Sequence, residues 1–105
     1  MPNFDQVLHD GDLPNSITFL EFTRFNKKLS PNSIPSSVKR LWLGDFYDHP
    51  LCNLPQNLEV LELGFYFSCE IRENDIPPSV TKIIIYPDYP HPIPPPLLKI
   101  IEFFD

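Results

Sequence analysis

Apolar side chains recur along this chain at constant distances from a proline. An apolar residue follows three, six and eight positions after each of five prolines. These are Pro14, Pro35, Pro55, Pro77 and Pro95. The last two apolar positions of each copy are two residues apart, the spacing at which side chains face the same side of a β-strand. We therefore expect five short strands, near residues 18–22, 39–43, 59–63, 82–86 and 99–103.

The central copy shows the repeated unit most clearly. Residues 58–63 read LEVLEL, which is the strand pattern L-x-x-L-x-L of a leucine-rich repeat. No stretch of the chain has a helical period. One such strand cannot bury its own apolar face, so neighbouring copies must stack against each other. The pattern predicts one domain over residues 1–105: a mainly β, parallel-strand leucine-rich-repeat solenoid of about five short repeats, with little or no α-helix.

The prolines divide this solenoid into approximate units. They are residues 1–12 (partial), 13–33, 34–53, 54–75, 76–93 and 94–105 (partial). In the last unit the inward positions are Leu98, Ile101 and Phe103. No polar cap is recognisable at either end, and an uncapped solenoid exposes an apolar end and an unpaired strand edge. We therefore expect Phe103 and Phe104 to be only partly covered, and the C-terminal end to self-associate or to be shielded by a further domain.

A second phrase recurs between the strands. It consists of an aromatic residue, usually a small polar residue, two variable positions and then Leu or Ile. Its copies are residues 4–8, 25–29, 47–51, 67–71 and 89–93. The aromatic and the final aliphatic side chain should both point into the core, while the polar second position suits a turn. Stacked copies predict a ladder of polar side chains, which Pro90 interrupts because proline has no N–H.

These two phrases together resemble the FNIP-repeat family, whose motif is roughly L-P-x-S-L-x-x-L-x-L-G-x-x-F-N-x-P-I. Phe25 and Asn26 form the literal F-N pair, and residues 47–51 are a close variant. Gly44 and Gly64 stand at the family glycine, where a positive φ would let the chain leave the strand sharply, and Tyr86 replaces that glycine in the fourth copy. Such proteins occur mainly in social amoebae and in large DNA viruses that infect amoebae. Many carry an F-box, which implies substrate adaptors of ubiquitin ligases; no F-box is recognisable here.

Composition limits the partners. The formal net charge is −6 and the basic residues do not cluster, which argues against nucleic acid or an anionic membrane as the main partner. No apolar run reaches the length of a transmembrane helix. Two cysteines are too few for a secreted disulfide scaffold. We therefore expect a cytoplasmic protein, or one of the host cytoplasm if the chain is viral, without a cofactor.

The outward strand positions form columns across the predicted concave face. The first column contains Phe19, Arg40, Val60 and Lys82, and the second contains Glu21, Trp42, Glu62 and Ile84. Trp42 is an outward aromatic between two carboxylates, a composition typical of binding hot spots. Either a partner covers its ring, or Arg40 stacks on it and satisfies it within the chain. The face predicts a protein–protein interaction module; the alternative is a structural or orphan repeat array with no dedicated ligand.

One other column has residue types that bind metals. His49, Cys69 and His91 hold the same position in three successive copies. Closed structural zinc sites need four ligands, so a metal-binding module is the weaker hypothesis. The sequence has no phosphate-binding loop, no G-x-S-x-G and no H-E-x-x-H, and we do not expect an enzyme.

Overall fold

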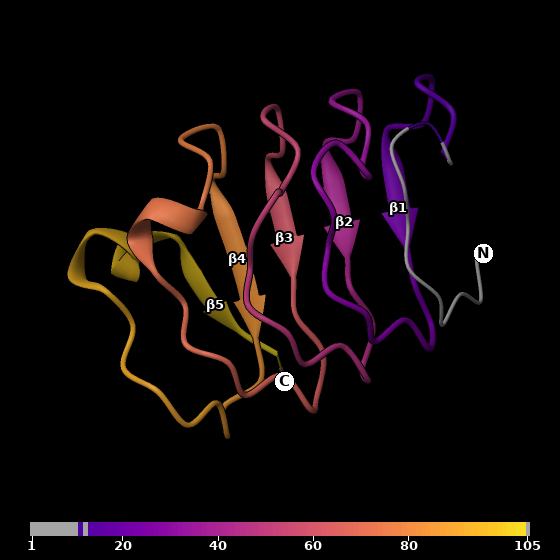
Figure 1. Ribbon diagram of the computed structural model, residues 1–105. Helices are drawn as coiled ribbons and strands as arrows, with labels where there is room; N and C mark the ends of the chain where they lie inside the picture. Colours follow the sequence, from indigo (N-terminus) through magenta and orange to yellow (C-terminus); the bar gives the residue numbers. More distant parts are fainter. Residues whose placement is uncertain (1–10, 12, 105) are drawn as a thin grey trace.

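The computed structural model describes residues 11 and 13–104, and its five strands form one parallel sheet in sequence order (Figure 1). The strands are β1 (Phe19–Glu21), β2 (Arg40–Trp42), β3 (Val60–Glu62), β4 (Lys82–Ile85) and β5 (Ile101–Phe103). Each coil contributes one strand and then returns along the other side of the core, as the ribbon in Figure 1 shows. The predicted solenoid and its five strand positions are confirmed. The predicted unit 1–12 and the phrase at residues 4–8 lie outside the described residues, apart from Gly11.

The core is built from the inward residue of every strand and the inward residues of the return segment. Leu20, Leu41, Leu61 and Ile83 pair in register across the first four strands, and all four are buried. Leu58 also enters this core from the turn before β3, where its N–H donates to the Pro55 carbonyl oxygen (3.2 Å). The proline thus begins a turn that aims the first apolar residue inward, as the spacing predicts.

The fifth copy departs from the predicted frame. Its turn bond runs from the Leu97 N–H to the Pro94 carbonyl oxygen (2.9 Å), so Pro94 rather than Pro95 begins the unit. Leu97 is consequently buried and Leu98 is 59% exposed, so the predicted inward position of Leu98 is wrong. A 3-10 helix, η2 (Pro95–Ile100), takes up the extra residue and returns Ile101 to its place opposite Ile83. The sequence does not predict this shift by one residue, because each of the three consecutive prolines at residues 94–96 fits the start of a turn.

Helical structure in the described residues is limited to η2 and a short 3-10 helix, η1 (Glu73–Asp75), in the return segment between β3 and β4. Proline explains the scarcity of helix. It has no N–H to donate in a helix interior, and the return segments are rich in it. The expectation of little or no α-helix is therefore confirmed.

The second phrase builds a continuous stack of aromatic rings, three of them buried and the fourth, Tyr89, half-buried. Phe25, Tyr47, Phe67 and Tyr89 lie one above the other, with neighbouring centroids 5.9, 6.3 and 5.8 Å apart and planes within 12° of parallel. Such separations lie within the range in which aromatic pairs attract each other beyond simple burial. We call this stack the aromatic ladder. The predicted inward direction of the aromatic residue is thus confirmed in the described copies.

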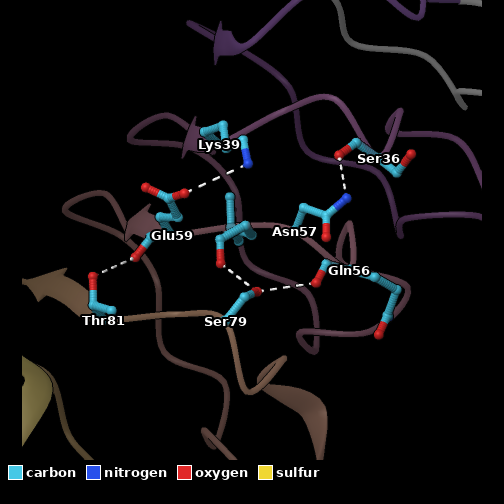
Figure 2. A network of polar contacts seen from close by, with 8 residues as sticks. Ser36, Lys39, Gln56, Asn57, Glu59, Ser79 and Thr81 are labelled. Carbon is cyan, nitrogen blue, oxygen red and sulfur yellow. Dashed lines mark hydrogen bonds and ion pairs between the residues drawn. The ribbon is translucent and has the colours of Figure 1, made fainter.

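Polar side chains tie neighbouring coils together at the proline end of the strands. The hydroxyl of Ser79 lies 2.6 Å from the Leu58 carbonyl oxygen and 3.0 Å from that of Gln56, so it can donate to either. The side-chain amide of Asn57 donates to the Ser36 carbonyl oxygen (3.1 Å). Figure 2 shows these contacts together with the Lys39–Glu59 ion pair (3.5 Å). The side chain two residues after Pro55 and the one two residues after Pro77 therefore each satisfy a carbonyl oxygen of the preceding coil.

The glycine after β3 has a different role from the predicted one. Gly44 has a positive φ (87°), but Gly64 does not, so the expectation of a positive φ at Gly64 is wrong. A Cβ built on Gly64 would overlap the carbonyl oxygen of Gly44 and the Cα of Asp45. Gly64 is needed because the backbone of its coil lies directly against that of the preceding coil.

The C-terminal strand leaves apolar surface uncovered. Phe103 pairs with Ile85 in register and points toward the core side, yet its side chain is 59% exposed. Phe104, one residue on, is 45% exposed. The expected partial cover of both rings is confirmed; self-association at this end stays a prediction.

The facing of the central strand gives a direct test. Leu61 is fully buried, so Leu61→Ala should lower the free energy of unfolding by about 2–5 kcal/mol out of a typical total of about 5–15 kcal/mol. Glu62→Ala, one residue further, should lower it by about 1 kcal/mol or less, because Glu62 makes only a surface ion pair with Arg40. Urea unfolding of both variants measures the difference. Equal losses would contradict the proposed facing of β3.

Candidate binding face

The outward side chains of the strands form one ordered surface, which we call the strand face. Its first row contains Phe19, Arg40, Val60 and Lys82, and its second row contains Glu21, Trp42, Glu62 and Ile84. Each row follows the strand register, so consecutive members are neighbours across paired strands. The structure therefore brings together all eight residues that the sequence selects for a binding surface. Whether they bind anything remains a proposal.

Charges on the strand face are largely paired across the strands. Arg40 Nη2 lies 2.9 Å from Glu62 Oε1, and Lys82 Nζ lies 3.3 Å from Glu102 Oε2. Glu21 has no ion-pair partner among residues 13–104. The guanidinium of Arg40 also lies over the ring of Phe19, 5.3 Å from its centroid. The expected alternative, in which Arg40 covers Trp42, is not the arrangement found.

A hollow of about 200 Å³ lies beside Trp42. It is lined by Glu21, Trp42, Glu62, Leu63, Tyr86 and Phe104. Tyr86 and Phe104 stack on each other with centroids 4.8 Å apart, and they form the wall at the carboxyl ends of the strands. Trp42 itself is half-buried rather than fully exposed. Trp42 thus contributes to a concave site lined by three aromatic residues, one leucine and two glutamates.

A row of exposed aromatic residues continues from this hollow, and sequence reasoning missed it. Phe46, Phe65 and Tyr66 are 47%, 52% and 57% exposed. Phe46 stacks on Tyr66 (5.7 Å), and Phe65 makes edge contacts with Tyr66 (5.1 Å) and with Tyr86 (5.4 Å). Contiguous exposed aromatic surface is unusual on a soluble domain and often marks an interaction site.

A signal for this row was present in the sequence. Phe46 precedes Tyr47, and Tyr66 precedes Phe67, so two copies contain a doubled aromatic. Phe46 and Tyr66 lie in the turns just before Tyr47 and Phe67, and only one ring of each adjacent pair enters the aromatic ladder. The other ring must then lie on the surface.

The metal candidates occupy the predicted column, but their side chains bond within the protein. His49 Nε2 donates to the Asn26 carbonyl oxygen (3.0 Å), and His91 Nε2 donates to the Ser68 carbonyl oxygen (2.7 Å). Cys69 Sγ lies 3.5 Å from Asp48 Oδ1. Within the part of the chain that the structure describes, no three His, Cys, Asp or Glu side chains are placed to hold a metal ion. Burial, together with the nearby Asp48 carboxylate, raises the pKa of the Cys69 thiol, which disfavours the thiolate that metals bind.

Asp48 is the centre of the predicted polar ladder. Its own N–H donates to Asn26 Oδ1 (3.0 Å), and its Oδ1 accepts from the Ser68 N–H (2.8 Å). The ladder ends at Ser68, because Pro90 at the same position of the next copy has no N–H to donate to the Ser68 side chain. Desolvation of the Asp48 carboxyl by its neighbours favours its neutral form, but the hydrogen bonds from Ser68 and Cys69 outweigh it and lower the pKa of the carboxyl.

None of the helices among the described residues has the length and apolar character needed to cross a membrane. Cys52 and Cys69 are both free thiols, and both are half-buried.

One short parallel strand per coil, inward leucines in register and irregular returns define a leucine-rich-repeat solenoid. The profile of the FNIP Repeat matches residues 4–46 and 47–88, and the chain belongs to this family. It is 36% identical over 86 residues, 78% of its length, to the probable serine/threonine-protein kinase fnkE of Dictyostelium discoideum. It also superimposes on CroV588, whose crystal structure is described as that of a novel circular LRR protein, with a TM-score of 0.86 and 33% identity over 98% of the chain.

The chain spans 6% of the kinase and 16% of CroV588. The likeness therefore covers a repeat region and not the remainder of either protein. As a class, FNIP and leucine-rich repeats are non-catalytic modules for protein interaction.

The hydrogen bonds of Asp48 predict a specific pH dependence. A carboxyl whose pKa is lower in the folded state stabilises the protein above its unfolded pKa of about 3.9, and this contribution is lost as the pH falls through the folded value. Asp48→Asn keeps an oxygen that accepts from Ser68, as Asn26 does for Asp48, but removes the titration. Urea unfolding should show a smaller loss of stability between pH 7 and pH 3 in this variant, with a difference below about 1 kcal/mol because the group is exposed. An identical pH profile in the two proteins would contradict this assignment.

Proposed function

We propose that this chain is a protein-interaction module that binds a protein partner through the strand face, with Trp42 as its anchor. The single observation that carries the proposal is the hollow beside Trp42, which is concave, aromatic and open to solvent. Binding energy concentrates in aromatic residues that sit in such pockets near the centre of an interface. The residues that support it are the eight of the two rows: Phe19, Glu21, Arg40, Trp42, Val60, Glu62, Lys82 and Ile84.

The exposed aromatic row extends the proposed interface beyond these eight residues. Phe46, Phe65 and Tyr66 lie where the chain leaves β2 and β3, and Phe65 contacts Tyr86 at the edge of the hollow. Tyrosine and phenylalanine are enriched in interface cores, whereas lysine and glutamate are depleted there. A partner that covers the hollow would therefore also reach this row.

A finer role follows from the family. Members with an F-box suggest substrate recognition within a ubiquitin-ligase adaptor, and we extend the proposal to this role and to a cytoplasmic setting. A captured partner whose ubiquitination depends on the strand face would support it. A structural array without a dedicated ligand is the competing account, and it predicts that no partner is lost when the strand face is altered.

Trp42→Ala tests the proposal. Because Trp42 lies outside the aliphatic core, its removal should shift the melting temperature by less than about 4 °C, which corresponds to about 1 kcal/mol or less for a domain of this size. Binding to the partner should weaken by at least about 2 kcal/mol, as for other anchor residues. Chemical cross-linking in a lysate of Dictyostelium discoideum, the organism of the related kinase, identifies candidate partners, and titration of the purified partner gives the affinity.

Glu73→Ala is a matched control for this experiment. Glu73 is exposed in η1 and makes no contact with the strand face. It should retain the partner at wild-type affinity. A Trp42→Ala protein that melts far lower yet binds its partner unchanged would show that Trp42 is a structural cover, and the proposed anchor would be wrong.

A further inference from the structure

We propose that the hollow beside Trp42 receives an arginine side chain from a basic segment of the partner protein. This inference rests on the proposed function of the strand face and specifies its ligand. Three aromatic residues, Trp42, Tyr86 and Phe104, line the hollow together with the acidic residues Glu21 and Glu62. None of the lining residues carries a positive charge.

The charges around the hollow favour a cation. The two rows and their continuation to Glu102 contain two cationic side chains and three carboxylates. Arg40 pairs with Glu62 and Lys82 pairs with Glu102, which leaves the Glu21 carboxylate at the hollow without an ion-pair partner in the described part of the chain. An acidic group would be repelled here, and an apolar group would remove water from Glu21 without replacing its hydrogen bonds. The net charge of −6 also attracts basic segments over a longer range.

Arginine fits this combination better than other cationic groups. Its guanidinium is planar and weakly hydrated, so it stacks on an aromatic ring and still donates to a carboxylate that lies in the guanidinium's own plane. The strand face already holds one guanidinium in this way. Arg40 lies over the ring of Phe19 at 5.3 Å and donates to Glu62 at 2.9 Å. The hollow offers a second set of the same groups, with Trp42, Tyr86 and Phe104 as rings and Glu21 as the free carboxylate.

Trp42 is the only tryptophan of the chain, so its fluorescence reports on the hollow directly. The experiment titrates the intact protein with the peptide acetyl-Gly-Arg-Gly-amide at constant ionic strength. The comparison peptide replaces arginine by citrulline, which has nearly the same shape and no charge. We expect a saturable change in emission with the arginine peptide, and an affinity for the citrulline peptide that is lower by about fivefold or more, in line with cation–π and exposed ion-pair strengths.

Two variants locate the effect. Glu21→Gln should weaken arginine binding by about threefold, because it removes the free carboxylate. Glu73→Gln changes the net charge equally but lies in η1 outside the hollow, and it should leave the affinity within about twofold. Circular dichroism of both variants checks that the fold is retained.

Equal affinities for the two peptides, or equal effects of the two variants, would overturn the arginine assignment. So would the lack of a saturable change up to about 10 mM arginine peptide, which is about ten times a weak Kd of about 1 mM. These outcomes are separate from failure of the proposed function. If Trp42→Ala still abolishes capture of the partner while citrulline binds as well as arginine, the strand face is the interface and its ligand is not arginine.

Discussion

Pairing between neighbouring parallel strands sets the spacing on which the rest of this structure depends. Strands in a sheet lie about 4.8 Å apart, and each coil of this chain contributes only one. All remaining groups of a coil that contact the next coil must then do so at a similar distance. The aromatic ladder does so with centroids 5.8 to 6.3 Å apart, and Asp48 does so through its bonds to Asn26 and Ser68. Gly64 has no side chain because the backbones meet there.

This arrangement makes the protein nearly one-dimensional. Each coil is stabilised by its two neighbours, and stability in such proteins is close to a sum of unit and interface contributions. The same register that stacks the core also lines up the outward side chains. Trp42 lies between Glu21 and Glu62 for the same reason that Leu41 lies between Leu20 and Leu61. The candidate site is therefore a consequence of the repeat, and single substitutions on the outward rows can change its chemistry without altering the core.

Much of the fold follows from the sequence because the same pattern occurs in several copies. The strand positions, the inward leucines and the direction of the ladder aromatics all rest on patterns that several copies share. The incorrect predictions concern positions at which the pattern fits the sequence in two ways, or at which one residue type can serve two roles. Consecutive prolines before Leu97 allowed two frames, and a local hydrogen bond chose the one that buries Leu97 rather than Leu98. At Gly64, the sequence shows that a glycine is needed but not whether the reason is φ or space.

The candidate site was predictable only in part. Strand alternation placed Trp42 and its carboxylate neighbours correctly, because alternation and register are both periodic. The wall of the hollow comes from Tyr86 and Phe104, which follow the paired residues Ile85 and Phe103 and are therefore neighbours by the same register. The spacing does not show that their rings stack and close one side of a hollow beside Trp42. For His49 and His91, the residue type suggested a metal, whereas the structure gives each ring a carbonyl oxygen of the preceding coil. Side-chain direction decides between these roles, and the sequence does not specify it at irregular positions.

The most direct test of this account is a pair of double-mutant cycles along the aromatic ladder, measured by urea unfolding. One cycle combines Tyr47→Leu with Phe67→Leu, whose rings are adjacent, and the other combines Phe25→Leu with Phe67→Leu, which are separated by Tyr47. Coupling through neighbouring coils predicts an interaction energy of about 0.5–1.5 kcal/mol for the adjacent pair and less than about 0.5 kcal/mol for the separated pair. Equal coupling in the two cycles, or none in the adjacent one, would contradict the claim that contacts between neighbouring coils hold this protein together.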